Sequence, residues 1–154
     1  MRPPSILFVC LGNICRSPLA EAAFREAARR EGLAAHAESA ATGEWQVGNA
    51  PDPRSQAVAL AHGIDISGKR ARRVRGADFT SFDHILALDP QNLLDLHAMA
   101  PGRSTARIGL LMDQVPGCAG QSVRDPYYGD AADFDAVWKQ VTRAADALVA
   151  TLKE

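Results

Sequence analysis

Short blocks of apolar residues alternate with longer blocks of mixed character along this chain. Residues 6–9 and 85–88 are continuous apolar runs, typical of strands that are buried on both faces of a parallel sheet. Residues 108–111 form a further run, and residues 35–40 are a weaker strand candidate. The pattern therefore predicts short, buried strands separated by longer segments.

The block after the first predicted strand has helical spacing and clear ends. Ser17 suits an N-cap, Pro18 suits the first helical position, and Gly32 is a natural stop. Between them, apolar residues recur at helical spacing while charged residues would face water. The apolar stripe consists of Ala20, Ala23, Phe24, Ala27 and Ala28.

Three more helices are predicted in the same way. An Asp-Pro pair at residues 52–53 begins the second helix, which ends at Gly63, and another pair at residues 89–90 begins the third. Four residues of the second helix are expected to face the core: Ala57, Val58, Leu60 and Ala61. The last helix carries the longest stripe, formed by Phe134, Val137, Trp138, Val141, Ala145, Leu148 and Leu152.

Strands that alternate with helices indicate an α/β fold with a parallel sheet and right-handed crossovers. At 154 residues the chain fits one domain, spanning residues 1–154. Ligands of such folds bind beyond the carboxyl ends of the strands. The residues that follow position 9 are therefore the first candidates for a functional site.

Composition mainly excludes functions. The chain is 47% hydrophobic and 23% charged, with a formal net charge of -1. That balance provides no general attraction to nucleic acid or to an anionic membrane surface. No apolar stretch is long enough to span a bilayer, and the residues before position 10 form no signal peptide. We therefore expect a cytoplasmic protein that binds neither nucleic acid nor membrane.

The cysteines and histidines do not indicate a metal site. Cys10, Cys15 and Cys118 are expected to remain thiols, because no export signal precedes them. Two neighbouring thiols and four scattered histidines lack the spacing of zinc ligands. Neither a metal nor another cofactor is expected, and Cys118 receives no role.

The segment from Cys10 to Pro18 carries the candidate chemistry. A strand-to-helix loop can direct consecutive backbone N–H groups at one point, and a helix N-terminus adds partial positive charge. Gly12 permits a tight turn with positive φ, and Asn13 tolerates that region better than most residues. Arg16 offers a planar fork for two phosphoryl oxygens, and Ser17 places a hydroxyl beside the loop. The pattern predicts a phosphate-binding loop.

Cys10 stands at the start of this loop, where a nucleophile would be needed. A helix N-terminus and a nearby cation favour the thiolate, which is the nucleophilic form of cysteine. Cys10 would then attack phosphorus while the loop amides and Arg16 hold the other oxygens. The alternative is a buried core cysteine with Arg16 in solvent. The Cys-(x)5-Arg motif with its Gly, Asn, Ser and Pro argues against that alternative.

Residues 10–18 resemble the signature of the low-molecular-weight protein tyrosine phosphatases, and the Asp-Pro-Tyr-Tyr-Gly segment at 125–129 resembles the family's second signature. The resemblance extends over nearly the whole chain. It implies a three-layer sandwich whose four-stranded parallel sheet is flanked by helices. It also implies a phosphocysteine intermediate, no cofactor, phosphotyrosine-containing proteins as substrates, and inorganic phosphate as product and inhibitor.

The resemblance also assigns roles to individual residues. Cys10 would be the nucleophile, Arg16 the phosphate binder and Asp125 the general acid. Asn13, Ser17 and Ser39 match positions whose hydrogen bonds shape the loop and hold the nucleophile. The rest of the phosphate-binding loop is formed by Leu11, Gly12, Ile14 and Cys15.

The chemistry independently requires a proton donor and walls for a flat ring. Asp125 could protonate the leaving oxygen and later activate water, although an Asp-Pro pair is also a common turn. Trp45, Tyr127 and Tyr128 fall on predicted loops, where they could form a slot for an aryl group or pack partly into the core. An aromatic residue at position 45 resembles the branch of the family that prefers aryl phosphates.

Three further features leave alternatives open. Cys15 could form a reversible, protective disulfide with Cys10, or could simply fill space as a buried thiol. The basic run at residues 69–75 could be a solvated face or could steer acidic phosphopeptides. Gly68 stands where vertebrate family members tend to carry a histidine that supports the loop asparagine, so the support of Asn13 is in question.

Other activities compete with phosphotyrosine hydrolysis. Arsenate reductases share the fold and nucleophile but need two further relay thiols, and residues 78–99 contain no cysteine. Phosphoarginine phosphatases resemble this loop but place threonine where Ile14 stands. A non-catalytic phosphate-binding module would be expected to lack the nucleophile or the acid, and both Cys10 and Asp125 are present.

Overall fold

The computed structural model describes residues 2–154, which contain a four-stranded sheet. The strands are β1 (Ser5–Cys10), β2 (His36–Ala41), β3 (His84–Ala87) and β4 (Arg107–Leu110). Their order is β2-β1-β3-β4 and every pairing is parallel. The predicted α/β fold with a four-stranded parallel sheet is confirmed, with strand ends shifted by about one residue.

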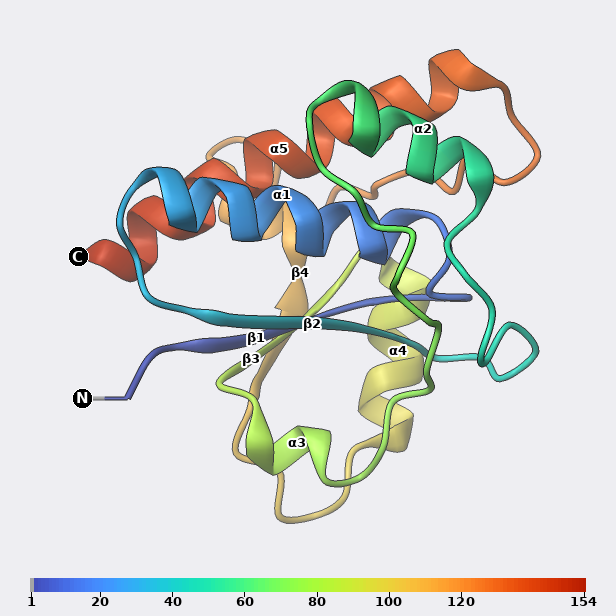
Figure 1. Cartoon of the computed structure of the whole chain (residues 1–154). Coiled ribbons are helices and arrows are strands. Elements are labelled where there is room, and N and C mark those ends of the chain that lie inside the picture. The colour runs from blue at the N-terminus through green and yellow to red at the C-terminus, as the bar shows by residue number, and fades with distance from the viewer. Residues whose placement is uncertain (1) are drawn as a thin grey trace.

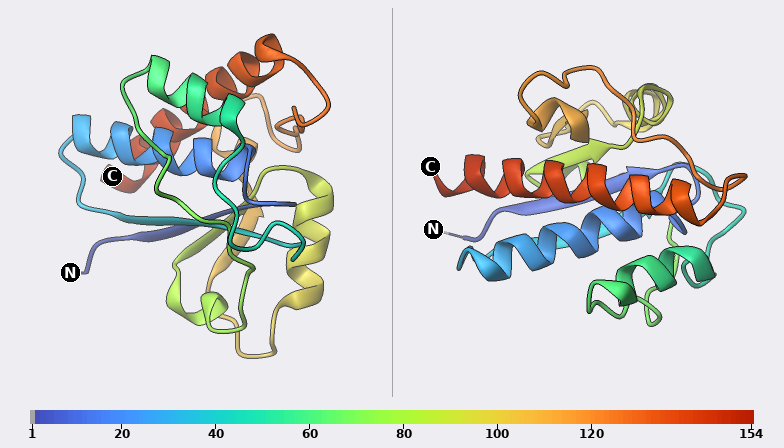
Figure 2. Two further views of the ribbon diagram at one scale, coloured as in Figure 1. Left: turned by 45° about the vertical axis from the view of Figure 1, so that its right-hand side comes forward. Right: turned by 90° about the horizontal axis from the view of Figure 1, so that it is seen from above.

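Helices cover both faces of the sheet (Figures 1 and 2). On one face lie α1 (Arg16–Arg30), α2 (Pro53–Ala61) and α5 (Ala131–Lys153), with α1 packed between the sheet and its two neighbours. On the other lie α4 (Pro90–Met99) and the single-turn α3 (Asp78–Ser81). The sequence patterns did not predict α3 or the 3-10 turn at Leu111–Gln114, which are too short for a periodic signal.

Alternate residues of β1 enter two separate cores. Ile6 and Phe8 pack with α1 and α5, while Leu7 and Val9 pack with the helices of the opposite face. All four side chains have no exposed surface. Burial on both faces explains why β1 is a continuous apolar run rather than an alternating one.

The start of α1 differs from the prediction. The helix begins at Arg16 with Cys15 in the N-cap position, so Ser17 and Pro18 lie inside the first turn. The Ser17 hydroxyl does not cap the helix, because it is hydrogen-bonded within the preceding loop. Proline is still tolerated there, since the first-turn N–H groups have no partner within the helix.

The inward face of α2 was predicted correctly for Val58 but wrongly for its other members. Ser55, Val58 and Ala59 are buried, whereas Leu60 is 65% exposed and Ala57 and Ala61 also face solvent. The helix packs against α1 and α5 through this narrow stripe. The stripe predicted for α5 is correct, and its Leu152 is half-buried at the edge of the core.

The crossovers bring the carboxyl ends of the strands to one edge of the molecule. Cys10 pairs in register with Ala41 of β2, and Val9 with Ala87 of β3. The loop after β1, the loop after β2 and the start of α4 therefore meet at this edge. Within residues 2–154, no helix is both long and apolar enough to cross a membrane.

Candidate active site

The loop between β1 and α1 curls tightly around a left-handed residue. Asn13 has φ 58° and is the one non-glycine residue with positive φ in the part of the chain that the structure describes. Gly12 does not have positive φ, so the turn geometry expected of it was wrong. A Cβ at Gly12 would lie 3.4 Å from the Gln46 side chain, which is an ordinary van der Waals contact. Neither a positive φ nor a lack of space therefore requires glycine at this position.

Asn13 holds the left-handed turn through its side chain. Its amide donates to Ser17 Oγ at 2.8 Å and to Ser39 Oγ at 2.9 Å, and its carbonyl accepts from the Arg72 backbone N–H at 3.1 Å. Asn13, Ser17 and Ser39 thus form one network, as predicted. Because all three polar bonds are buried or half-buried, removing one would leave an unpaired polar group.

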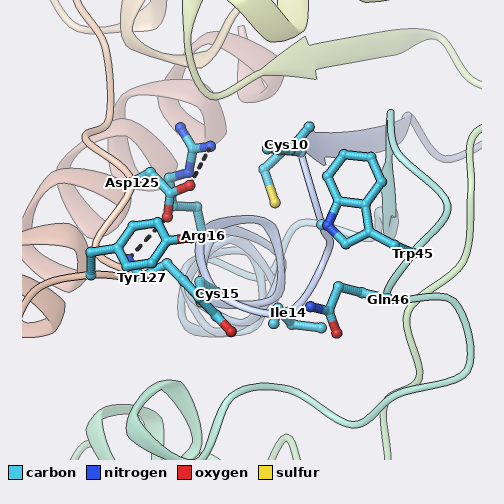
Figure 3. A pocket seen from close by; sticks show the side chains of 11 residues that line it. Cys10, Ile14, Cys15, Arg16, Trp45, Gln46, Asp125 and Tyr127 are labelled. Carbon is cyan, nitrogen blue, oxygen red and sulfur yellow. Dashed lines mark hydrogen bonds and ion pairs between the residues drawn. The ribbon is translucent and has the colours of Figure 1, made fainter.

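The Cys10 sulfur lies inside this curl. The backbone N–H of Asn13 donates to it at 3.3 Å, and Ser17 Oγ lies 3.1 Å from it. Both groups can donate to a sulfur anion, and the amino end of α1 adds its partial charge. The sulfur forms part of the floor of a cavity of about 380 Å³ (Figure 3).

Arg16 is buried beside this floor. Its Nη1 donates to Asp89 Oδ2 at 2.6 Å and to the Val123 carbonyl at 2.9 Å, and its Nη2 lies 3.7 Å from Asp125 Oδ2. Burial alone would lower the pKa of Arg16, but interactions with Cys10 and Asp89 outweigh it and raise the pKa. The guanidinium is thus a fixed, permanent cation beside the sulfur.

Asp89 is a site residue that the sequence analysis treated only as a helix start. Its Oδ1 accepts from the Asn92 backbone N–H at 2.7 Å and caps α4, while its Oδ2 holds Arg16. The sequence did hold one indication that Asp89 belongs to the site. It stands two residues after the end of β3, and residues that follow the strands of a parallel sheet lie at the same sheet edge as Cys10. One carboxylate therefore caps a helix and orients the Arg16 guanidinium.

Aromatic side chains stand on opposite sides of the cavity. Figure 3 shows Tyr127 on one side and Trp45 on the other, with the Cys10 sulfur between them. Trp45 is 65% and Tyr128 98% exposed, and the Tyr128 ring meets Tyr127 edge-on at 5.0 Å. All three predicted aromatic residues line the cavity, and packing into the core is excluded for Trp45 and Tyr128.

The remaining predicted loop residues also line the cavity. These are Leu11, Gly12, Ile14 and Cys15. The Gln46 side chain joins them, which the sequence analysis did not anticipate because nothing in the 42–51 loop marks it. The cavity is thus formed by the loop after β1, by the loop after β2 and by the segment before α5.

Asp125 reaches the cavity from this last segment. Its carboxylate is about half exposed, accepts from the Tyr127 backbone N–H at 3.1 Å and faces Arg16 (Figure 3). Asp125 lies more than a hundred residues beyond Cys10 and Arg16 in the sequence, yet all three line one cavity.

Behind the loop, a buried carboxylate extends the Asn13 network. Glu21 accepts from Ser39 Oγ at 2.8 Å and is ion-paired with Lys69 and with Arg25, the latter at 2.9 Å. Glu21 is only 2% exposed. Asn13 therefore has its full set of partners without any side chain at position 68.

The basic run at 69–75 is only partly a solvated face. Lys69 pairs with Glu21, and Arg72 pairs with Asp78 at 3.0 Å and with Glu38 at 3.3 Å. Asp78 is buried, so this part of the run is structural. Arg75 is exposed, as expected of a solvated residue.

Cys15 is buried at the end of the loop that follows β1. Burial, followed by the negative charges of Asp52 and of Cys10, raises its pKa to about 12. Cys15 is therefore a neutral thiol at physiological pH. Among residues 2–154, no three His, Cys, Asp or Glu side chains gather closely enough to hold a metal ion.

Fold and cavity together define a class of site: a cysteine sulfur cradled by a backbone loop and a buried arginine at the carboxyl edge of a parallel sheet. A sequence model of the low molecular weight phosphotyrosine protein phosphatases matches residues 5–154. The chain belongs to this family, whose members are hydrolases.

Individual relatives agree with this assignment. The low molecular weight protein-tyrosine-phosphatase YfkJ of Bacillus subtilis is 40% identical over 152 residues, covering 97% of this chain and 96% of its own. Its crystal structure superposes with a TM-score of 0.91 over 99% of this chain and 96% of its own. The human low molecular weight phosphotyrosine protein phosphatase is 42% identical over 94% of this chain and 93% of its own.

A Drosophila arginine phosphatase has a similar structure. Its crystal structure is 31% identical, with a TM-score of 0.89 over 97% of this chain and 98% of its own. The fold therefore does not by itself distinguish a tyrosine phosphatase from an arginine phosphatase.

Proposed function

We propose that this chain forms a single phosphatase domain that hydrolyses phosphotyrosine and other aryl phosphate monoesters through a phosphocysteine on Cys10. The observation that carries the proposal is the convergence of three groups on one cavity. The Cys10 sulfur, the buried Arg16 guanidinium and the half-exposed Asp125 carboxyl all line it. Phosphotyrosine-containing proteins are the proposed substrates, and inorganic phosphate is the product and a competing ligand.

In the first step the Cys10 thiolate attacks phosphorus. A sulfur–phosphorus bond forms and the bond from phosphorus to the aryl oxygen breaks. Arg16 and the loop N–H groups hold the remaining phosphoryl oxygens, which carry the negative charge of the transition state. Asp125 in its protonated form gives its proton to the departing aryl oxygen, so that a neutral phenol leaves.

In the second step water replaces the sulfur. Asp125, now a carboxylate, takes a proton from a water molecule that attacks phosphorus, and the sulfur–phosphorus bond breaks. Inorganic phosphate leaves and Cys10 returns to a thiolate. The Ser17 hydroxyl, 3.1 Å from the sulfur, can donate a hydrogen bond that stabilises this leaving thiolate.

The shape of the cavity supports an aryl substrate. Trp45 and Tyr127 flank the opening and can hold a flat ring between them. Ile14 lines the same cavity and offers no hydroxyl to a guanidinium group. For both reasons phosphotyrosine is favoured over phosphoarginine, and rates on the two phosphoamino acids measured side by side test this choice.

The mechanism is tested by rapid quenching and mass spectrometry. Protein mixed with an aryl phosphate should carry one added phosphoryl group on Cys10. With an aryl phosphate whose leaving group needs no proton, Asp125→Ala should accumulate this adduct, because the adduct still forms while the attack of water loses its general base. Cys10→Ser should form none on a millisecond-to-second timescale. Turnover by the wild type without any adduct on Cys10 would refute the proposal.

We further propose that Cys15 forms a reversible disulfide with Cys10 under oxidation. A peroxide would first oxidise the Cys10 thiolate to a sulfenic acid, and the Cys15 thiol would displace water to close the disulfide. Both sulfurs lie on the same tightly curled loop and line the same cavity. If peroxide-treated protein contains no Cys10–Cys15 disulfide by mass spectrometry, Cys15 is a buried thiol that only fills space.

A further inference from the structure

The segment that carries Asp125 has few anchors of its own. It runs between the 3-10 turn and α5 without regular structure, and Figure 1 shows it passing close to the start of α2. Within residues 124–129 two hydrogen bonds are local: Tyr127 N–H to Asp125, and Gly129 N–H to the Pro126 carbonyl at 2.8 Å. Neither bond ties the segment to the rest of the molecule.

Arg54, on the first turn of α2, provides that connection. Its Nη2 donates to the Tyr127 carbonyl at 2.9 Å and its Nη1 to the Gly129 carbonyl at 3.1 Å. Its guanidinium carbon also lies 4.5 Å from the centre of the buried Phe134 ring, at the start of α5. The Arg54 side chain therefore holds the backbone carbonyls of Tyr127 and Gly129, the two residues that flank Tyr128.

Arg54 is itself held in a single orientation. Asp52 accepts from its Nε at 3.0 Å and from its Nη2 at 2.9 Å, a two-point pairing that fixes the plane of the guanidinium. Hydrogen bonds from the Arg54 side chain lower the pKa of Asp52, which keeps this pair ionised. Asp52 also caps α2 by accepting from the Arg54 backbone N–H at 2.8 Å.

The same helix end is joined to the phosphate-binding loop. The Asp52 backbone N–H donates to the Ile14 carbonyl at 2.8 Å, and Ser55 Oγ donates to the Cys15 carbonyl at 3.3 Å. A continuous chain of hydrogen bonds thus leads from the loop around Cys10, through Asp52 and Arg54, to the backbone that follows Asp125.

We propose that Arg54 is a positioning residue for the general acid: it fixes the Asp125 segment against the phosphate-binding loop by holding the Tyr127 and Gly129 carbonyls. This role rests on the proposed function, in which Asp125 protonates the leaving oxygen. Arg54 does not touch the substrate in this scheme. It determines how often the Asp125 carboxyl lies within reach of the aryl oxygen.

The test compares two substrates that differ in their need for the acid. Phenyl phosphate has a poor leaving group that needs the proton, whereas 2,4-dinitrophenyl phosphate leaves readily without it. Arg54→Gln and Arg54→Lys should lower kcat/KM on phenyl phosphate by about tenfold or more. Their kcat/KM on dinitrophenyl phosphate should stay close to that of the wild type, because kcat/KM covers only the steps up to release of the phenol and this leaving group needs no proton.

Two reference variants make the result specific. Asp125→Ala should show the same dependence on the leaving group with a larger effect. Arg103→Gln changes an exposed arginine between α4 and β4, at the opposite edge of the sheet, and should affect neither substrate. A purely structural role of Arg54 would lower both rates by the same factor, and that result overturns the proposal.

The pattern of rates also distinguishes failure of the proposed function from failure of the role of Arg54 alone. If Asp125→Ala shows no dependence on the leaving group, Asp125 is not the acid and the role of Arg54 falls with it. If Asp125→Ala shows the dependence and Arg54→Gln does not, only the role of Arg54 is refuted. Should Arg54→Gln fail to fold, Asp52→Asn retains Arg54 but weakens the pairing, and it should show a smaller dependence of the same kind.

Discussion

The two segments that meet at the cavity are held in opposite ways. The loop between β1 and α1, proposed to bind phosphate, is largely buried, and the Asn13 side chain alone makes three hydrogen bonds that hold it to α1, to β2 and to the backbone of Arg72. The segment that carries Asp125 is largely exposed and is tied to α2 through the single side chain of Arg54. Under the proposed function, a loop fixed in the core would bind the phosphoryl group, while the proton would come from a segment that Arg54 and Arg16 connect to the rest of the molecule.

This difference matches the chemistry proposed for each segment. Charge stabilisation works best when the donors are already in place and need no reorganisation during the reaction. The acid must serve two steps with two different oxygens, one on the departing phenol and one on water. Changes in the phosphate-binding loop should therefore affect every substrate alike, and changes around Asp125 should depend on the leaving group.

The largest effect is expected for Arg16→Lys. Lysine is a point charge that cannot hold Asp89 and the Val123 carbonyl while presenting a second edge to the phosphoryl group. We expect kcat/KM to fall by about 10²–10³ on phenyl phosphate and on dinitrophenyl phosphate alike. Steady-state kinetics with Arg103→Gln as the control measures this, and an effect confined to phenyl phosphate would contradict the distinction between the two segments.

The next effect is expected for Asn13→Ala, in stability as well as rate. Alanine is strained at φ 58°, removes one hydrogen bond each from Ser17 and Ser39, and leaves the Arg72 N–H without its acceptor. The free energy of unfolding should fall by about 2–4 kcal/mol, measured by urea denaturation.

Asn13→Gly separates the two causes of this loss. Glycine adopts positive φ without strain, so this variant should recover the part of the stability that the backbone accounts for. Its kcat on both aryl phosphates should remain low, because the lost side chain no longer holds the loop. Full recovery of the rate in Asn13→Gly would show that the Asn13 hydrogen bonds do not matter for catalysis.

A smaller effect is expected for Gly43→Ala, which tests the wall of the cavity. A Cβ at this position would lie 2.5 Å from the Trp45 ring, so the indole must move away from its place beside the cavity. KM for phenyl phosphate should rise by about threefold to tenfold with little change in kcat. Gly68→Ala is the matched control, because a Cβ there meets nothing within 4 Å. In a Trp45→Ala background the Gly43→Ala change should have no further effect.

The smallest effect concerns Cys15 and alkaline pH. Folding raises the pKa of this thiol from 9.0 to about 12, so the folded protein keeps a proton that the unfolded chain releases in this range. Stability must therefore fall as the pH rises from 9.0 towards 12. Urea denaturation should show a steeper loss for the wild type than for Cys15→Ala above pH 9.0, and parallel curves below it. Parallel curves throughout would mean that Cys15 ionises normally.

The sequence was most informative where a single local segment carries both structure and chemistry. The run at 6–9 and the motif at 10–18 together predicted a strand, a loop and a helix, and each is present. Errors arose where a neighbour decides the outcome. The positive φ expected of Gly12 is adopted by its neighbour Asn13, and Leu60 is exposed because α2 buries only a narrow stripe. Ser17 looked like a helix cap, but its hydroxyl is used by Asn13 and Cys10.

What the sequence determined by itself was the order of the strands and longer helices, the parallel sheet, and the motif of a cysteine with an arginine six residues later. Local periodicity and one contiguous motif contain that information. Only the tertiary structure showed that Asp89 orients Arg16, that Glu21 and Lys69 support Asn13 from behind, and that Arg54 anchors the Asp125 segment. These partners are separated along the chain and adjacent only in space. No local pattern marks such pairs, because the crossovers of the fold, rather than the spacing of residues, bring them together.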